Sequence, residues 1–358
     1  MIIVDAHQDI AYSHLCFGRD YRQSALEVRR LEVGTPAAEH NGLATIGLPE
    51  ALAGRVALVF GTLFVAPQTN KPSPWQDLQY GDAAKAHQLA SQQFDYYERL
   101  AESSDHVMLV RSQADLDAVL ATWADDAPET GRRQGLVVLM ENADPIIEPK
   151  QFEEWYARGV RIVGPAWAGT RYCGGTGYPG PLTELGFELL DVMADFNAIL
   201  DLSHMAEEAY YQAVDRYEGV IIASHGNPRR FRDSDRHLSD DMIRRLAERD
   251  GVMGAVLFNR FLSNTWAPGD PKHDVTLNTV LDSIDYVCQL TGSAAHVGIG
   301  SDFDGGFGAQ SIPDVFDTVG DLPRIGTGLR QRGYSEADIE AILSGNMLRK
   351  LRQALPLK

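Results

Sequence analysis

Short apolar runs alternate with longer amphipathic stretches along most of the chain, and this pattern predicts strands that alternate with helices. The run at residues 55–65 is apolar on both faces, as expected for a strand of a parallel sheet. Strands are predicted at residues 1–6, 55–65, 135–140, 160–163, 198–202, 220–223, 252–258 and 297–300. Their alternation with helices predicts an α/β fold of the (β/α)8 TIM barrel type, in which residues 1–358 form one domain with loop and helical insertions.

The segments between these strands are expected to be mostly helical. Helices are predicted at residues 48–52, 82–103, 113–123, 182–196, 206–217, 240–250, 276–291 and 335–355, the last with a break at Gly345-Asn346. Irregular connections are predicted for the polar residues 18–47, for the loop with Pro67, Pro72 and Pro74, and for the glycine-rich residues 169–180. The glycine-rich segment is either a flexible connection or a lid over a site.

A doubly wound open sheet is the alternative fold. It would need a glycine-rich phosphate-binding turn after the first strand, and His7-Gln8-Asp9-Ile10 does not provide one.

Charge and cysteine content narrow the class of protein. The formal net charge of −18 and the isoelectric point of about 4.9 argue against nucleic acid and anionic membranes as partners. The three cysteines form no CxxC pair, and their odd number argues against a disulfide framework. The chain enters an apolar strand at once, without the basic stretch of a signal peptide, and no apolar run is long enough to span a membrane. A cytoplasmic protein is therefore expected.

Polar residues of the metal-binding type stand at the carboxyl ends of five predicted strands. They are His7, Asp9, Glu141, His204, His225 and Asp302. In a TIM barrel the carboxyl ends of all strands meet at one face, so these side chains are expected to converge. Each alone is an ordinary polar residue, but together they predict a metal site with nitrogen and oxygen ligands.

Three histidines and at least two carboxylates exceed what one tetrahedral ion needs, so two divalent metal ions that share a carboxylate are expected. The ligand set suits zinc, and also manganese, iron or cobalt. Such pairs activate a bridging hydroxide for hydrolysis. None of the lysines ends a predicted strand, which leaves Glu141 as the best bridging candidate. A calcium loop that begins at Asp302 is rejected, because its twelfth position is Pro313 rather than glutamate.

Several different motifs follow one another in a characteristic order and spacing over nearly the whole chain. They are Asp5-Ala6-His7-Gln8-Asp9, Glu141, Asp201-Leu202-Ser203-His204, Ser224-His225, Arg236 followed by Ser239-Asp240-Asp241, and Gly298-Ile299-Gly300-Ser301-Asp302-Phe303-Asp304-Gly305. Together they resemble the renal, or membrane, dipeptidases, a family of binuclear zinc peptidases with a barrel fold. The resemblance implies that His7 and Asp9 hold one ion and that His204 and His225 hold the other. Glu141 would bridge the two.

The resemblance also implies roles beyond the ions. Asp302 would act as general base on the bridging water and then as acid to the leaving amine, and Arg236 would pair with the substrate carboxylate. The residues expected around the substrate differ from the family pattern at three places. Trp167 stands where the family has a histidine that helps to stabilise the oxyanion, Asn142-Ala143-Asp144-Pro145 replaces a glycine-rich step, and Phe258 stands where a tyrosine hydroxyl is expected.

Three functions are therefore open. The first is a dizinc hydrolase that cleaves a dipeptide, including one with a D-residue, or a small N-acyl amino acid. The second is a hydrolase of a non-peptide amide, lactone or ester, selected by Trp167. The third is a non-catalytic metal-binding barrel, against which Asp302 argues because that carboxylate is needed mainly for proton transfer. The expected partner is a small-molecule substrate, and a homodimer is compatible with the resemblance.

Overall fold

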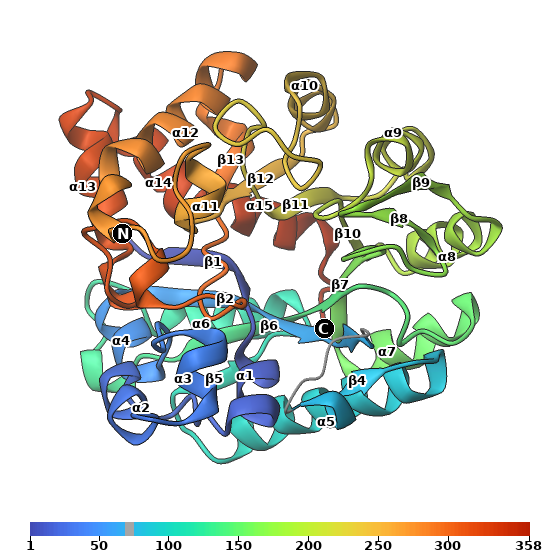
Figure 1. Cartoon of the computed structure of the whole chain (residues 1–358), viewed down its shortest axis with the longest axis horizontal. Helices are drawn as coiled ribbons and strands as arrows, with labels where there is room; N and C mark the ends of the chain where they lie inside the picture. Colours follow the sequence, from blue (N-terminus) through green and yellow to red (C-terminus); the bar gives the residue numbers. More distant parts are fainter. Residues whose placement is uncertain (69–74) are drawn as a thin grey trace.

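The computed structural model describes residues 1–68 and 75–358, so Pro72 and Pro74 of the predicted proline loop lie outside the described residues. Within these ranges, eight parallel strands form a closed ring, with helices outside it (Figure 1). The ring strands are β1 (Ile3–Gln8), β2 (Val56–Phe64), β6 (Gln134–Glu141), β7 (Val160–Gly164), β10 (Ile199–Asp201), β11 (Ile221–Gly226), β12 (Val252–Ala255) and β13 (Val297–Ile299). Each corresponds to one of the predicted strands. Five short strands lie outside the ring within the described residues: β3 (Ala66–Pro67), β4 (Gln79–Tyr80), β5 (Val107–Leu109), β8 (Cys173–Gly175) and β9 (Tyr178–Leu182).

Pairing between β2 and β6 closes the ring. The ring strands neighbour one another in chain order, and β13 pairs again with β1. The β2–β6 register runs without a shift from Leu58 opposite Gly135 to Phe64 opposite Glu141. A doubly wound sheet keeps two free edges, so the closed ring confirms the TIM barrel and excludes the alternative fold.

The ring strands are buried on both faces. One apolar cluster gathers residues from seven of them, including Val4, Phe60, Leu139 and Ile222, together with side chains of α15 (Asn346–Ala354), and it fills the barrel interior. A second cluster packs the other face of the strands against the surrounding helices. This two-sided burial explains why the strands read as continuous apolar runs in the sequence.

The outer helices begin and end at local sequence signals. They are α4 (Leu48–Ala53), α5 (Ala83–Glu102), α6 (Gln113–Ala121), α7 (Phe152–Arg158), α8 (Glu184–Asp195), α9 (Glu207–Arg216), α10 (Asp240–Glu248), α12 (Leu277–Thr291), α13 (Pro323–Gln331) and α14 (Glu336–Glu340). Asp82, Ser112 and Ser239 each accept a backbone N–H bond at the start of α5, α6 and α10. Gly292 ends α12 in the left-handed conformation, with φ 69°. A π-helical segment (Ala341–Gly345) joins α14 to α15, where the break was predicted.

Among the described residues, no helix combines the length and the apolar character that crossing a bilayer requires.

The polar segment 18–47 is more regular than predicted. It carries α2 (Ala25–Leu31) and α3 (Pro36–Asn41), and α1 (Ile10–Phe17) precedes it. These helices are short, so their sequence periodicity is weak.

The segment 169–180, predicted as a loop, is largely an antiparallel hairpin of β8 (Cys173–Gly175) and β9 (Tyr178–Leu182). The glycines permit close approach rather than disorder, because a Cβ on Gly174 would lie 2.5 Å from backbone atoms of Gly180.

The strand predicted at residues 252–258 ends early, at Ala255. The backbone N–H of Val256 donates to Asn227 Oδ1, a side chain, instead of continuing the ladder. The chain then turns into the single helical turn α11 (Asn259–Leu262), for which Phe258 is the N-cap residue.

A buried ion-pair network fastens the segment 18–47 to the loop after β13. Arg19 is 6% exposed, and its Nη1 donates to Asp304 Oδ2 over 2.8 Å. Its Nε and Nη2 donate to the two carboxylate oxygens of Glu32 over 2.8 and 2.9 Å. Asp304 also accepts from the backbone N–H and the hydroxyl of Thr45. The loop after β13 is therefore held from outside the barrel.

Candidate active site

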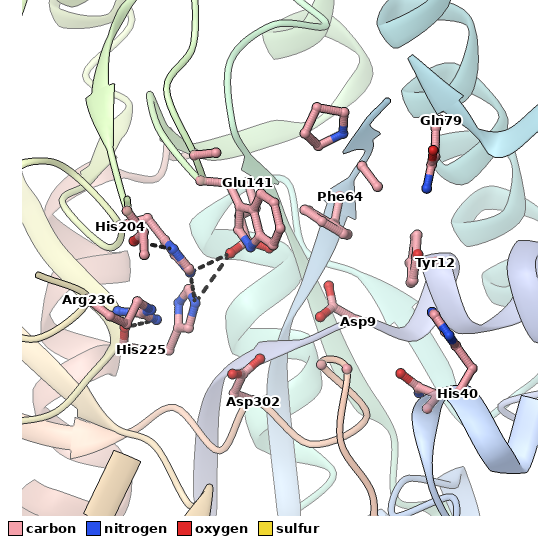
Figure 2. A pocket seen from close by; sticks show the side chains of 18 of the residues that line it. Asp9, Tyr12, His40, Phe64, Gln79, Glu141, His204, His225, Arg236 and Asp302 are labelled. Carbon is pink, nitrogen blue, oxygen red and sulfur yellow. Dashed lines mark hydrogen bonds and ion pairs between the residues drawn. The ribbon is translucent and has the colours of Figure 1, made fainter. Parts of the chain in front are cut away.

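Polar side chains predicted at the strand ends gather around the Glu141 carboxylate at the carboxyl face of the barrel (Figure 2). Glu141 Oε1 lies 3.2 Å from His204 Nε2 and 3.3 Å from His225 Nε2. Glu141 Oε2 lies 3.5 Å from His7 Nε2. The same nitrogen of His7 lies 3.8 Å from Asp302 Oδ1. The convergence expected from the barrel rule is thus present, while the role of each side chain stays a prediction.

Two trios of side chains have ligand atoms close enough together to hold one metal ion each. One is His7, Asp9 and Glu141, and the other is Glu141, His204 and His225; within each trio the ligand atoms lie within 4.8 Å of one another. Glu141 belongs to both. This is the arrangement of two ligand sets joined by one carboxylate that the resemblance implied.

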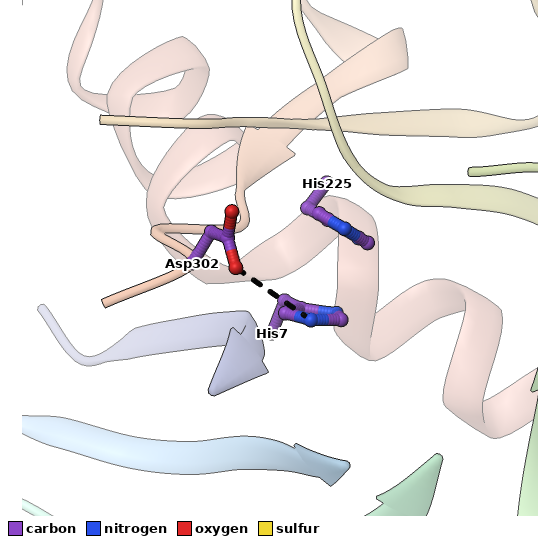
Figure 3. Close-up of side chains that lie close together, drawn as sticks. All are labelled: His7, His225 and Asp302. Carbon is purple, nitrogen blue, oxygen red and sulfur yellow. Dashed lines mark ion pairs between the residues drawn. The ribbon is translucent and has the colours of Figure 1, made fainter. Parts of the chain in front are cut away.

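A third trio competes for the same space. His7, His225 and Asp302 meet the same distance criterion, and Figure 3 shows Asp302 directed toward His7. The rings of His7 and His225 stack with their centroids 3.6 Å apart. Asp302 is therefore placed either to act on a group held between these imidazoles or to bind a cation itself.

Hydrogen bonds on the far side of the rings fix which nitrogen of His225 carries a proton. Ser224 Oγ donates to Asp201 Oδ2 over 2.5 Å, which uses the single proton of the hydroxyl. Ser224 Oγ therefore accepts from His225 Nδ1, 2.9 Å away, and it also lies 3.4 Å from His7 Nδ1. His225 Nε2 is left with a lone pair directed at Glu141.

This arrangement of acceptors fits a divalent cation. His225 Nε2 lies 3.1 Å from His204 Nε2, and both face Glu141 Oε1. Burial, with the nearby Arg236, lowers the pKa of His204 to about 4, and burial also holds the pKa of His225 well below its usual value. Neutral imidazole nitrogens that converge on a carboxylate are suited to bind a metal ion. Thr176 Oγ1, 3.0 Å from His204 Nδ1, supports the second ring from the β8–β9 hairpin.

Buried carboxylates crowd together in the site and shift the pKa values of one another and of His7. Burial alone would lower the pKa of His7, but the attraction of Glu141, Asp9 and Asp302 outweighs it and raises the pKa to about 10. Burial and the Glu141 carboxylate raise the pKa of Asp9 to about 7. Burial likewise raises the pKa of Asp302 well above its usual value, with Asp9 adding to the shift. A cation bound here would stabilise the ionised form of these carboxyl groups.

The residues after Glu141 explain one departure from the family pattern. Asn142 adopts the left-handed conformation with φ 62°, which glycine would adopt freely and which asparagine tolerates. Its side-chain Nδ2 donates to Val65 O over 2.9 Å. Asparagine therefore replaces glycine here without loss of the turn.

The loop after β13 carries Asp302 in a left-handed conformation, with φ 60°. The Asp5 carboxylate fixes this loop by accepting the backbone N–H of Ser301 over 2.7 Å and its hydroxyl over 2.5 Å. Gly305 leaves room for the carboxylate, because a Cβ there would lie 2.0 Å from Asp302 Oδ1. The bonds from Ser301 to Asp5 and the absence of a side chain at Gly305 together set the position of Asp302.

A cavity of about 610 Å³ opens beside these groups. Glu141, His204, His225 and Asp302 lie in its wall, and Arg236 stands at one end (Figure 2). Arg236 is 5% exposed, and its Nη2 donates to the backbone oxygen of His225 over 3.0 Å. Its Nε and Nη1 are buried and have no hydrogen-bond partner among the described residues. A buried guanidinium with two free donors beside a cavity is suited to a carboxylate of a bound molecule.

Two aromatic residues predicted to contact substrate have different outcomes in the structure. Trp167 lines the cavity and packs between Phe64 and His204, with ring centroids 5.1 and 6.1 Å away. Phe258 is not among the lining residues. Its ring stacks on Phe307 at 4.2 Å, and Phe261, one turn further along α11, lines the cavity instead. The early end of β12 causes this exchange.

Other lining residues had no clear signal in the sequence. Tyr12 and Phe17 reach the cavity from α1, and His40 from α3. The strand-end rule does not cover residues on such helices. Ser224 and Asp201, which lie behind the rings, were visible only as parts of motifs.

Comparison with known proteins agrees with this geometry. The sequence profile of the membrane dipeptidase family (peptidase family M19) matches residues 1–357. An uncharacterized protein in the pqqA 5′ region of Klebsiella pneumoniae is 32% identical over 214 residues, which are 57% of this chain and 76% of that protein. Alignments with seven further curated relatives cover 33% to 66% of those proteins.

Solved structures share the fold over the full length. The probable dipeptidase PvdM from Pseudomonas aeruginosa superposes with a TM-score of 0.79 at 21% identity, covering 99% of this chain and 95% of that chain. A metallopeptidase from Rhodobacter sphaeroides, liganded with a phosphinate mimic of the dipeptide L-Ala-D-Ala, gives a TM-score of 0.77 at 21% identity and covers 99% of both chains.

Proposed function

The chain belongs to the membrane dipeptidase family, peptidase family M19, and on that premise we propose that it is a dizinc dipeptidase. Membership makes it a metallohydrolase that acts on amide bonds. The proposed substrate is a dipeptide with a free carboxylate, and the proposed reaction is hydrolysis of its amide bond. The Rhodobacter sphaeroides relative, whose ligand mimics a dipeptide, supports this substrate class.

The proposed ligands are the two trios that share Glu141. His7 and Asp9 belong to one trio, and His204 and His225 to the other. Two bound divalent ions would lower the pKa of a shared water and polarise the scissile carbonyl. The protein's own contribution is to hold the neutral imidazoles of His204 and His225 and the shared carboxylate in place in the metal-free state, through the hydrogen bonds behind these two rings.

Asp302 is the proposed proton carrier. Its carboxylate lies beside the imidazoles of His7 and His225, and it also forms part of the cavity wall, where it can reach both water and substrate. It takes a proton from the attacking water and delivers it to the leaving amine nitrogen. Burial raises its pKa well above the usual value, which favours a carboxyl that holds the proton between the two steps.

Arg236 is the proposed anchor for the substrate. Its unpaired Nε and Nη1 can donate two bonds to the terminal carboxylate, and burial strengthens that attraction. The observation that carries the proposal is this pairing at one cavity: a carboxylate shared by two possible metal trios beside a buried guanidinium with free donors.

Reconstitution tests the proposal. The protein is dialysed against a chelator, reloaded with zinc, assayed for metal content by mass spectrometry, and incubated with L- and D-containing dipeptides and N-acetyl amino acids. The expected result is two zinc ions per chain and release of free amino acids from dipeptides. A protein that holds two ions but cleaves no dipeptide in the panel contradicts the proposal.

A pair of variants checks the ligand assignment. Glu141→Gln should lose both ions because it removes the shared carboxylate. Glu154→Gln, on the exposed face of α7, should keep both ions and full activity. Retention of both ions by Glu141→Gln would overturn the bridging role.

A further inference from the structure

We propose that the end of the cavity remote from Arg236 is a subsite for an aromatic side chain on the N-terminal residue of the dipeptide. This inference rests on the proposed function and adds to it the chemical class of substrate that the site prefers. It assigns a role to Tyr12, Phe17, Phe64 and Trp167, which line the cavity but take no part in metal binding or proton transfer.

A continuous row of aromatic rings leads outward from the imidazole cluster. Trp167 lies 6.1 Å from His204 and 5.1 Å from Phe64, centroid to centroid. Phe64 then meets Tyr12 at 5.1 Å, and Tyr12 meets Phe17 at 5.9 Å. These spacings leave ring faces and edges arranged as a wall along one side of the cavity.

The row extends beyond Phe17 to a more polar rim. Phe17 lies 6.3 Å from the His40 ring and 4.9 Å from the Trp75 ring. Gln79 and His40 line this outer end of the cavity (Figure 2). The subsite is therefore apolar along its length and polar at its tip.

The two ends of the cavity set the direction of the substrate. Figure 2 shows Arg236 on one side of Glu141 and Tyr12, His40 and Gln79 on the other. A dipeptide whose carboxylate is held at Arg236 and whose amide lies over the Glu141 cluster directs its N-terminal residue toward the aromatic row. The side chain of that residue is the part of the substrate that the row can contact.

Within the described part of the chain, the remote end of the cavity wall carries no lysine or arginine that could pair with an acidic side chain. Among the described residues that line the cavity, the carboxylates are Asp9, Glu141 and Asp302, and all three belong to the cluster already assigned to ions and proton transfer. The remote wall offers Ala66 and Pro67 beside the rings. An acidic or basic side chain there would lose water without meeting an opposite charge, whereas an aromatic ring would pack against the wall.

The test compares dipeptides that differ only in the N-terminal residue. With the zinc-loaded enzyme, kcat/KM is measured for glycyl, leucyl, phenylalanyl, tryptophanyl, glutamyl and lysyl dipeptides that share one C-terminal residue. The phenylalanyl substrate should exceed the glycyl one by on the order of 10²-fold, the factor expected when an apolar side chain of that size leaves water. A ratio near one, or a preference for a charged residue, overturns the inference.

Two variants locate the preference in the row. Trp167→Ala and Phe17→Ala should each reduce the phenylalanyl-to-glycyl ratio by about tenfold or more, since each removes one wall of the subsite. Phe196→Ala is the matched control, because Phe196, like Phe17, is a half-buried phenylalanine at the carboxyl end of a helix, and it does not line the cavity. Unchanged ratios in both cavity variants, with metal content and circular dichroism intact, overturn the assignment to these residues.

The outcomes separate this inference from the function on which it rests. Equal cleavage of phenylalanyl and glycyl dipeptides defeats the subsite and leaves the dipeptidase standing. Absence of cleavage for every dipeptide defeats the dipeptidase, and calorimetric binding of phenylalanine amide against glycine amide to the zinc-loaded protein then decides the subsite. Tighter binding of the aromatic amide supports it, and equal binding overturns it.

Discussion

Removal of the Ser224 hydroxyl tests whether its hydrogen bonds orient the histidine rings of the site. Ser224→Ala deletes the bond to Asp201 Oδ2, at 2.5 Å, and the acceptor for His225 Nδ1, at 2.9 Å. It also removes the weaker interaction of the hydroxyl with His7 Nδ1, at 3.4 Å. The substitution leaves both imidazoles in place but removes the group that fixes where the His225 proton lies.

Two effects of different size follow. Asp201 is 1% exposed and keeps the bonds from Ser203 and from the Ser224 backbone N–H, so loss of one hydroxyl partner should cost about 1–3 kcal/mol of metal-free stability. Loss of support behind a metal-binding histidine weakens metal affinity by roughly 10–100-fold, or about 1.4–2.7 kcal/mol. Both effects should appear in the same protein.

Urea unfolding of the metal-free protein measures the first effect, and competition with a chromogenic zinc chelator measures the second. Ser283→Ala is the matched control, because Ser283 is a buried serine of α12 whose Oγ has no hydrogen-bond partner in the part of the chain that the structure describes. That variant should change neither quantity by more than about 0.5 kcal/mol. If Ser224→Ala binds zinc as tightly as the unsubstituted protein does, the proposed orientation of the rings is wrong.

Three further predictions concern the proton carrier and the ions. Asp302→Asn should keep two zinc ions while kcat falls by roughly 10²–10⁴-fold, and loss of an ion would show that Asp302 is a ligand instead. Gly305→Ala places a Cβ 2.0 Å from Asp302 Oδ1, so it should displace that carboxylate and lower kcat at least about tenfold with metal content intact; an unchanged kcat refutes this. Because the pKa of His7 is raised to about 10 in the metal-free site, His7 is protonated at neutral pH and must lose its proton to bind zinc. Zinc affinity should therefore rise as pH rises toward that value, and calorimetry in buffers of different ionisation enthalpy should record proton release, whose absence would contradict the assignment.

The barrel and the strand-end cluster were accessible from the sequence because one geometric rule connects them. The carboxyl ends of parallel strands meet at one face, so Glu141 and Asp302 could be placed together from their positions after apolar runs. The direction of the His7 side chain was harder to predict. The register shifts between Asp5 and Gln8 in β1, and strict alternation alone would not have fixed where His7 points.

Arg236 and Trp167 were predicted beside the substrate and both line the cavity, but the other aromatic residues of its wall were not predicted, for a different reason. Tyr12 and Phe17 lie on α1, a helix too short to show a distinct periodicity. Phe258 was expected at the end of a strand, but the ladder stops at Ala255 and the following helical turn presents Phe261 instead. The strand end depends on which acceptor binds a single backbone N–H, here that of Val256, which donates to the Asn227 side chain. The pattern of apolar residues in the sequence does not show which acceptor that will be.

The buried ion-pair network around Arg19 makes a distant part of the chain a support for the loop that carries Asp302. Arg19 does not line the cavity, yet it is bonded to Asp304, two residues beyond Asp302. Loss of one member of a buried ion pair leaves the other charge uncompensated, at a cost of about 3–5 kcal/mol. On the proposed role of Asp302, a substitution at Arg19 is expected to lower activity by disturbing the loop that holds this carboxylate, although Arg19 does not line the cavity.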